Sequence, residues 1–396
     1  MKRFVAFAVL ASLLIAPVSQ AAPKKISVKP MKLLTTISSP EEVSGAVVSG
    51  TSIILFGTKS SKAYARAIDK TGKELWSLSL DQSEASIATA ATVDLAGEIW
   101  IAGATPLATG LTPPSPTPTP LNPDNAVIPP SAFIGDLQAV TIWKVSAAGA
   151  LVFTNTLPTS SVLFPTSIAV DKNGASVVGI IASDKGNAGF LANADTTGVF
   201  SKLLKIGVAS TTVDAVVRHG DGSFTVTGSS SETLLGKKVA GITDGILVKV
   251  SKSLKITSVV RSSVAKGKRI WNSASSSLLL AGQVIVGNNI QTAVTKFSST
   301  YVPTWTARFT STGYALVNSS NQLFFQSMGP SPQLAWNAMT PTPLLLTFDS
   351  KGVITAAHSA PPGQVELMSL VDSKELGVLA LIWSAESASI FTPITR

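Results

Sequence analysis

The stretch Val93-Asp94-Leu95-Ala96-Gly97-Glu98-Ile99-Trp100-Ile101-Ala102-Gly103 holds a complete β-hairpin in eleven residues. The Asp-x-x-Gly segment supplies the side-chain cap and the positive φ angle that a tight turn between two strands requires. The residues on either side have the apolar, partly β-branched and aromatic character of buried strands. The segment therefore predicts two antiparallel strands joined by a short turn, the second of which ends in glycine.

The same hairpin recurs along the chain. Clear copies lie at 170–179 and 217–228, and weaker copies at 47–57, 271–282, 315–328 and 370–383, which makes seven in all. Every copy except the last is followed by a second hairpin with its own polar turn, so each unit has four strands and the units recur about every 50 residues. Four-stranded units repeated roughly four to eight times are typical of β-propeller blades.

The N-terminal part of the chain has one strand too many for the repeat, and the C-terminal unit has one too few. The seventh unit has only three candidate strands, the last at 389–394, whereas the strand Met31 to Ile37 belongs to no unit. Placing that strand outermost in the seventh unit removes an open sheet edge. The predicted fold class is therefore all-β: a single β-propeller of about seven four-stranded blades, closed by an N-terminal strand that pairs in the last blade. A two-sheet sandwich and rings of six or eight blades are the alternatives.

These units resemble those of the bacterial seven-bladed β-propeller repeat proteins, of WD40-like type, over nearly the whole chain after residue 21. One hairpin, Ala67-Ile68-Asp69-Lys70-Thr71-Gly72-Lys73-Glu74-Leu75-Trp76, is similar to a quinoprotein-type repeat, with one residue fewer between Asp69 and Thr71 than that pattern usually shows. The resemblance implies the fold and no cofactor, because such motifs are shared by proteins of unrelated function.

The N-terminus predicts export. Lys2 and Arg3 precede the apolar run 4–15, and Ser19-Gln20-Ala21 is a small-x-small cleavage site, so we expect a signal peptide at 1–21 and a propeller domain at 22–396. The run is too short for a membrane anchor and is interrupted by Pro17. The chain has no cysteine, which excludes disulfides, thiolate sites and a cysteine-linked lipid anchor. The expected location is the periplasm, the cell surface or the extracellular space.

The charge of the chain is basic. The formal net charge of +9 falls to about +7 without Lys2 and Arg3, and the remaining basic residues are scattered. In an exported protein this balance favours contact with anionic envelope polymers rather than nucleic acid. Small basic clusters occur at Lys24-Lys25, Lys237-Lys238 and Lys266-Lys268-Arg269, and each is either solvated surface or a contact for an anionic polymer.

Sequence motifs for catalysis are missing. The chain has no HExxH, no calcium-binding loop, no GxSxG and no glycine-rich nucleotide loop. His219 and His358 fall in or beside turns of different blades. The acids of the repeated turns are predicted to be caps, namely Asp69, Asp94, Asp171, Asp195, Asp349 and Asp372. Acids outside that pattern are better placed for a site, namely Asp81, Glu84, Asp184, Glu232, Asp244 and Glu386.

Loop lengths indicate which face of the ring binds. In a meander, the turns within hairpins share one face, and the loops that join hairpins and blades share the other, which we call the connector face. The length variation falls on this second set, at 104–135, 229–244 and 329–343. The first of these is an insertion with nine prolines between 106 and 130, which predicts an extended, solvated loop or a partner-docking arm.

Function is concentrated in long loops on rigid scaffolds, so the predicted ligand-binding residues are Trp336, Lys237 and Lys238, with no catalytic or metal-binding residue. The sequence favours an exported β-propeller that acts as a binding or scaffold module for an envelope or extracellular partner, either a protein or a polysaccharide. The alternative is a propeller enzyme, a hydrolase or lyase of glycans or peptides, that uses carboxylates on the connector face. Two or three acids, or a His–acid pair, within hydrogen-bonding reach at the central mouth would favour the enzyme.

Overall fold

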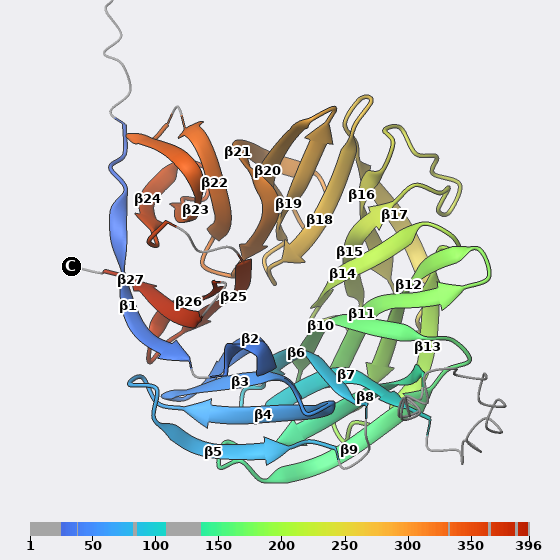
Figure 1. Ribbon diagram of the computed structural model, residues 1–396. Helices are drawn as coiled ribbons and strands as arrows, with labels where there is room; N and C mark the ends of the chain where they lie inside the picture. Colours follow the sequence, from blue (N-terminus) through green and yellow to red (C-terminus); the bar gives the residue numbers. More distant parts are fainter. Residues whose placement is uncertain are drawn as a thin grey trace, which may run out of the picture.

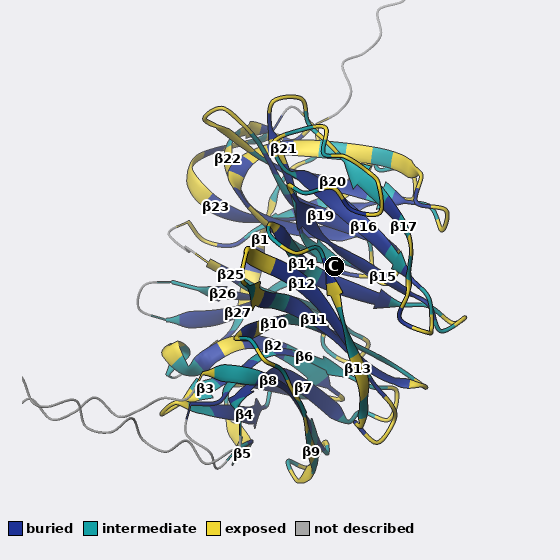
Figure 2. Cartoon of the chain, turned by 90° about the vertical axis from the view of Figure 1, so that its right-hand side faces the viewer, coloured by how far each residue is buried: buried dark blue, intermediate teal, exposed yellow. Residues whose placement is uncertain are grey.

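The computed structural model describes residues 25–37, 39–81, 85–107, 136–331, 333–362, 366–384 and 387–394. The strands of this part of the chain form seven antiparallel blades around a central axis (Figure 1). Buried residues follow the middle strands of the blades, whereas exposed residues gather in loops and turns (Figure 2). Within these ranges no helix is long and apolar enough to cross a membrane. The predicted signal peptide lies outside the described residues.

Blades 1 to 4 each consist of four consecutive strands, as the repeat predicts. Blade 1 contains β2 (Val43–Ser49), β3 (Ser52–Lys59), β4 (Lys62–Ile68) and β5 (Glu74–Ser79). Blade 2 contains β6 (Ile87–Val93), β7 (Ile99–Pro106), β8 (Leu137–Val145) and β9 (Leu151–Pro158). Blade 3 contains β10 (Leu163–Asp171), β11 (Gly174–Ser183), β12 (Gly186–Ala194) and β13 (Phe200–Ile206), and blade 4 contains β14 (Thr211–Arg218), β15 (Phe224–Ser230), β16 (Asp244–Val250) and β17 (Ile256–Ser262). A short 3-10 helix, η1 (Pro40–Glu42), precedes blade 1.

Blades 5, 6 and 7 are joined by shared pairing into one eleven-stranded ladder. Blade 5 contains β18 (Lys268–Ala274), β19 (Leu279–Val286), β20 (Asn289–Phe297) and the first part of β21 (Pro303–Val317); blade 6 contains the rest of β21, β22 (Gln322–Ser331), β23 (Trp336–Phe348) and β24 (Ile354–Ser359); and blade 7 contains β25 (Glu366–Ser373), β26 (Gly377–Trp383), β27 (Ala388–Pro393) and β1 (Lys29–Ile37). The predicted count of seven blades is confirmed.

Strand β1 closes the ring, as predicted. It pairs antiparallel with β27 from Met31 opposite Pro393 to Ile37 opposite Ala388. Its first residue, Lys29, also pairs in parallel with His358 on β24, so β1 links blade 7 to blade 6. Met31 and Ile37 are buried in the apolar clusters on the two sides of blade 7. The spare N-terminal strand and the missing fourth strand are therefore the same structural element.

The innermost strand of every blade is irregular at an equivalent place. Its register against the second strand shifts within its first few residues, which marks a β-bulge with an extra, unpaired residue. In six blades this residue is Ser44, Thr89, Thr166, Asp214, Asn272 or Met368, and in blade 6 the irregular segment is 312–314. Each bulge follows the connection from the preceding blade, so the bulges form a ring near the connector face.

The bulges explain why the second strand of the repeat ends in glycine. Gly57, Gly103, Gly179, Gly228 and Gly282 each pair with the residue next to a bulge. A Cβ atom added at any of them would lie between 1.8 and 2.1 Å from a backbone carbonyl oxygen of the inner strand or, for Gly57, of Glu42 just before that strand. Only a residue without a side chain permits this approach, because real Cβ contacts do not come so close.

Of two loops predicted from the sequence, the insertion in blade 2 lies where it was expected, whereas the segment 329–343 is a hairpin. Strand β7 ends at Pro106 and β8 begins at Leu137, so the insertion lies between the second and third strands of blade 2, as predicted; residues 108–135 are outside the described part. The segment 329–343 was predicted to be a loop, and that was wrong. Strands β22 and β23 continue through most of it, because buried Leu334 and its bridge to Ile26 hold the hairpin tip against the blade.

Candidate functional site

The innermost strands surround a central channel with a cavity of about 440 Å³. Every blade contributes the residue at its bulge to the wall of this channel. The ring consists of Ser44, Thr89, Thr166, Asp214, Asn272, Tyr314 and Met368. Four of the seven are small or medium neutral polar side chains, and the other three are the Asp214 carboxylate, the Tyr314 ring and the Met368 thioether. Because a bulge leaves its extra residue out of the ladder, each blade presents a side chain to the channel at the same level.

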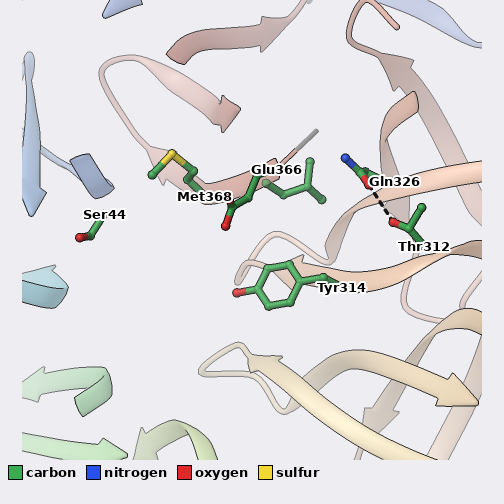
Figure 3. A pocket seen from close by; sticks show the side chains of 7 residues that line it. Ser44, Thr312, Tyr314, Gln326, Glu366 and Met368 are labelled. Carbon is green, nitrogen blue, oxygen red and sulfur yellow. Dashed lines mark hydrogen bonds between the residues drawn. The ribbon is translucent and has the colours of Figure 1, made fainter. Parts of the chain in front are cut away.

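A pocket of about 430 Å³ opens at the mouth of this channel, between blades 6, 7 and 1. Its wall carries the polar side chains of Ser44, Thr312, Gln326 and Glu366 beside the ring of Tyr314 and the thioether of Met368. Thr312 Oγ1 donates a hydrogen bond of 2.7 Å to Gln326 Oε1. The Glu366 carboxylate points toward the Tyr314 ring (Figure 3). We call this pocket the channel mouth.

The channel and its mouth are acidic. Burial raises the pKa of Asp214 to about 7, although Thr212 opposes this by donating a hydrogen bond of 3.3 Å to the carboxylate. Burial also raises the pKa of Tyr314, and the negative charges of Asp214 and Glu366 raise it further. In the described part of the chain, neither carboxylate has an ion-pair partner. The channel and its mouth therefore combine the Tyr314 ring with two carboxylates, Asp214 in the channel and Glu366 in the mouth, that have no ion-pair partner in the described part of the chain.

The raised pKa of Asp214 predicts a pH-dependent stability. Because this carboxyl titrates near pH 7 in the folded state and near 3.8 otherwise, its protonated form is the one the fold favours, and that advantage is lost as the pH rises through 7. Asp214→Asn removes the ionised form. We expect the stability advantage of the variant over the wild type in urea unfolding to be smallest below pH 4, to grow as the pH rises from 4 to 7, and to reach about 1–2 kcal/mol at pH 8.5, since channel water screens part of the cost. A difference that does not change with pH would contradict the assignment.

The structure places the three predicted binding residues apart. Trp336 begins β23 in blade 6, where its half-buried indole packs against the apolar cluster of that blade and its Nε1 donates to Ser327 Oγ at 3.2 Å. Lys237 and Lys238 are exposed in the β15–β16 loop of blade 4. The Lys237 carbonyl accepts a hydrogen bond of 3.1 Å from Arg261 Nε. Blade 5 lies between the two positions, and their roles in binding stay predictions.

Most acids named from the sequence have structural partners. The turn acids Asp69, Asp94, Asp171, Asp195 and Asp349 accept backbone N–H groups of their own turns, as predicted. Asp372 instead accepts the hydroxyl of Ser320 in the neighbouring blade.

Two acids outside the turn pattern hold connector-face loops in place. Glu232 accepts the backbone N–H groups of 208–210 and the hydroxyl of Thr211, so it fixes the connection between blades 3 and 4. Asp244 is fully buried, accepts the N–H groups of Ala240 and Gly241, and lies 3.4 Å from Arg261 Nη1. Glu84 and Glu386 lie outside the described residues.

The histidines do not form a site with these acids. His219 Nε2 lies 2.6 Å from Thr225 Oγ1, which lies 2.6 Å from the hydroxyl of Tyr301, so the chain of hydrogen bonds joins blades 4 and 5 on the hairpin-turn face. Burial lowers the pKa of His219. His358 lies on β24 beside β1. In the described ranges, no group of three or more His, Asp or Glu residues could hold a metal ion.

Sequence reasoning missed three residues of the channel and its mouth: Asp214, Tyr314 and Glu366. One signal was available for Asp214. It stands within an apolar inner strand at the place where other copies of the repeat have Ser44, Thr89 or Thr166, so an alignment of the seven copies singles it out as the charged member. Tyr314 and Glu366 lie in or beside the two most degenerate units, where no such alignment could be made from the sequence.

Comparisons with known proteins support the fold. No family model matches the chain, and no curated protein matches it in sequence. Among solved structures, the WD40 domain of Toxoplasma gondii coronin has 10% identity and a TM-score of 0.50 and covers 94% of this chain and 90% of its own. A candidate 6-phosphogluconolactonase from Bacteroides uniformis has 10% identity and a TM-score of 0.51 and covers 86% and 90%.

The β-propeller domain of the trilobed protease from Pyrococcus furiosus is also similar, with 10% identity, a TM-score of 0.46 and coverage of 93% and 97%. At such low identity, the likeness to the coronin domain and to the lactonase-like protein establishes the fold alone. The chain is therefore a β-propeller with seven four-stranded blades, and its function has to be argued from its own residues.

Proposed function

We propose that this chain is an exported binding module that holds a basic segment of a protein partner on its connector face, with the channel mouth as the central contact. The observation that carries the proposal is the pocket of about 430 Å³ in which Tyr314, Glu366 and Met368 meet at the end of the channel. Concave sites with a few convergent polar groups are where small ligands and side chains bind. The predicted signal peptide supports a location outside the cytoplasm.

Exposed apolar side chains favour a protein as the partner. In the described part of the chain, nineteen large apolar side chains are exposed, and ten of them are on the connector side of blades 3 to 6. They are Val162, Phe164, Val208, Leu235, Ile242, Val286, Ile290, Tyr314, Met328 and Met339. Aromatic residues and Met are enriched in protein interfaces, and Met adapts to irregular partner surfaces. A polysaccharide would leave most of these side chains without an apolar partner.

Charge favours a cationic group at the channel mouth. An ammonium ion placed over the Tyr314 ring is attracted by its negative face, and desolvated contacts of this kind are worth up to about 2 kcal/mol. Glu366 and Asp214 supply the counter-charges, and a charge-assisted hydrogen bond to either would be stronger than a neutral one. A lysine side chain of the partner fits these requirements.

The enzyme is the second candidate, and one observation favours it. The pKa of Asp214, about 7, suits a general acid or base that works at neutral pH. Within the described chain, the structure shows no hydrogen bond from Tyr314 to Asp214 or to Glu366, so these groups do not form an assembled acid–base pair. Cleavage of a bound peptide or glycan that is lost in Asp214→Asn would assign the chain to this second class.

A matched pair of peptides tests the proposal. One short peptide, blocked at both ends, carries a single central lysine, and the other carries acetyl-lysine at the same place. We expect the lysine peptide to bind more tightly, and Tyr314→Ala and Glu366→Gln each to weaken its binding about tenfold, or about 1.4 kcal/mol. Glu375→Gln, in the hairpin turn of the same blade on the opposite face, should have no effect.

The same peptide measurement tests the extent of the binding surface. A change of peptide affinity in Trp336→Ala, or in the double change of Lys237 and Lys238 to Glu, would show that the surface reaches blade 6 or blade 4. Equal affinity for both peptides would refute a cationic ligand. Binding of a neutral hexasaccharide, with neither peptide bound, would assign the connector face to a polysaccharide instead.

A further inference from the structure

A second, smaller cavity lies between blades 4 and 5, away from the channel mouth. It has a volume of about 150 Å³ and is lined by three arginines: Arg261 at the end of β17, Arg269 at the start of β18, and Arg308 on β21. No carboxylate is among the residues that line it. A cavity with three guanidinium groups and no acid in its wall has an excess of positive charge.

Arg269 shows this most directly. Its side chain is 3% exposed, yet its Nη1 has no hydrogen-bond partner and no carboxylate pairs with it in the described chain. Its Nη2 reaches only the Ala293 carbonyl, at 3.4 Å. The guanidinium lies over the Trp271 ring, 3.6 Å from the ring centre to Cζ, which fixes the plane of the group. A buried, oriented donor is therefore left unused beside an open cavity.

The environment penalises this charge. Burial lowers the pKa of Arg269 to about 9, and the positive charge of Arg308 contributes to that shift. A buried charge without a partner is one of the costliest features that a folded protein can contain. Arg261 gives no relief, because it has the same sign and is already paired with Asp244 at 3.4 Å. An anion between Arg269 and Arg308 would offset both the repulsion and the burial.

Hydroxyl groups complete the cavity wall. Ser262 ends β17 and Ser263 follows it, and Thr295 and Thr306 face each other on β20 and β21 with their Oγ1 atoms 2.9 Å apart. Hydroxyl donors beside guanidinium groups are the usual partners of phosphate and sulfate oxygens, and the planar guanidinium can contact two such oxygens at once. The basic cluster at Lys266, Lys268 and Arg269, noted in the sequence, lies at the same junction between blades.

We propose that this cavity is a binding site for a tetrahedral oxyanion, phosphate or sulfate, held between Arg269 and Arg308. The site is distinct from the channel mouth and does not depend on the function proposed for it. The anion is either free in solution or the terminal group of a phosphate or sulfate ester on an envelope molecule. In both cases the anion binds a site that exists only in the folded protein, so its binding stabilises the fold.

Thermal unfolding at constant ionic strength tests the site. We expect 10 mM inorganic phosphate or sulfate to raise the melting temperature of the wild type by several degrees relative to chloride, because a ligand that binds only the folded state stabilises it. Methyl phosphate distinguishes the two sources: a similar rise means that esters are accepted, whereas no rise means that the free anion is the ligand. Lys205→Gln, on the outer strand of blade 3, is the control for a general loss of positive charge.

Two variants decide the outcome. Arg308→Gln changes an exposed residue and should weaken phosphate binding at least tenfold without loss of folding. Arg269→Met should abolish the phosphate effect and, in chloride alone, melt no lower than the wild type, because the uncompensated buried charge is gone. The proposal is wrong if phosphate and chloride give the same melting temperature in the wild type. It is also wrong if Arg308→Gln responds to phosphate as fully as the wild type and the Lys205→Gln control do.

Discussion

Removal of residues 29–37 should leave a protein that aggregates or melts at least ten degrees below the intact chain. Strand β1 is the outer edge of blade 7 and is also paired with β24 of blade 6. Its loss exposes the edge of β27 and the buried partners of Met31 and Ile37, whose burial alone contributes about 2–3 kcal/mol each. With the ladder bonds to β27 included, the loss approaches the total stability of a typical domain.

A circular permutant separates ring closure from simple loss of contacts. Met31 pairs with Pro393, so the start of β1 lies next to the end of β27, and a short turn can join 393 to 30. If the chain is opened between β1 and β2, blade 7 of the permutant consists of four consecutive strands. It is then complete, but no strand from the other end of the chain pairs in it. It should fold as a monomer and melt between the deletion variant and the wild type. A deletion variant that is monomeric and as stable as the wild type would show that β1 does not close the ring.

Gly103→Ala should destabilise the protein by about 3 kcal/mol or more. The added Cβ would lie 1.8 Å from the carbonyl oxygen of Ile87 and 2.8 Å from Cζ3 of Trp143. The first of these atoms belongs to the backbone next to the bulge of blade 2, so the clash cannot be relieved by rotating a side chain. Urea unfolding of the variant and the wild type measures the loss.

Gly220→Ala is the matched control for this change. The site lies in a hairpin turn of blade 4, its φ angle is not in the left-handed region, and an added Cβ meets no atom within 4 Å. The control should unfold at the wild-type urea concentration. If Gly103→Ala and Gly220→Ala are equally stable, the bulge does not impose glycine on the second strand.

The fold could be predicted because its determinants are local. Asp94 and Gly97 specify a turn by their own chemistry, and the apolar residues around them specify strands, so seven copies of one pattern give seven blades. Closure could be inferred by elimination, from one spare strand and one missing strand. The extension of β22 and β23 through 329–343 could not be predicted, because it depends on the distant contact of Leu334 with Ile26.

The candidate sites could not be read from the sequence for a related reason. Asp214, Tyr314 and Glu366 come from three blades and meet only through ring geometry. Trp336 was predicted to bind because its segment, rich in Pro and apolar residues, was expected to be a loop, whereas its indole packs on its own blade. Arg269 was visible as part of a basic cluster, but its burial beside Arg308, which is 39 positions away, is a property of the blade interface.

The most direct test of the channel mouth uses the methionines of the protein. The chain has five, and four remain after residue 21: Met368 in the mouth, Met328 and Met339 on the blade 6 hairpin, and Met31 buried in β1. Methyl-13C methionine spectra can therefore be followed while the blocked lysine peptide is added. We predict a saturating shift of the Met368 methyl resonance, with Met31 unchanged, that is lost with the acetyl-lysine peptide. A shift confined to Met328 and Met339, with Met368 unmoved, would contradict the assignment of the mouth as the binding site.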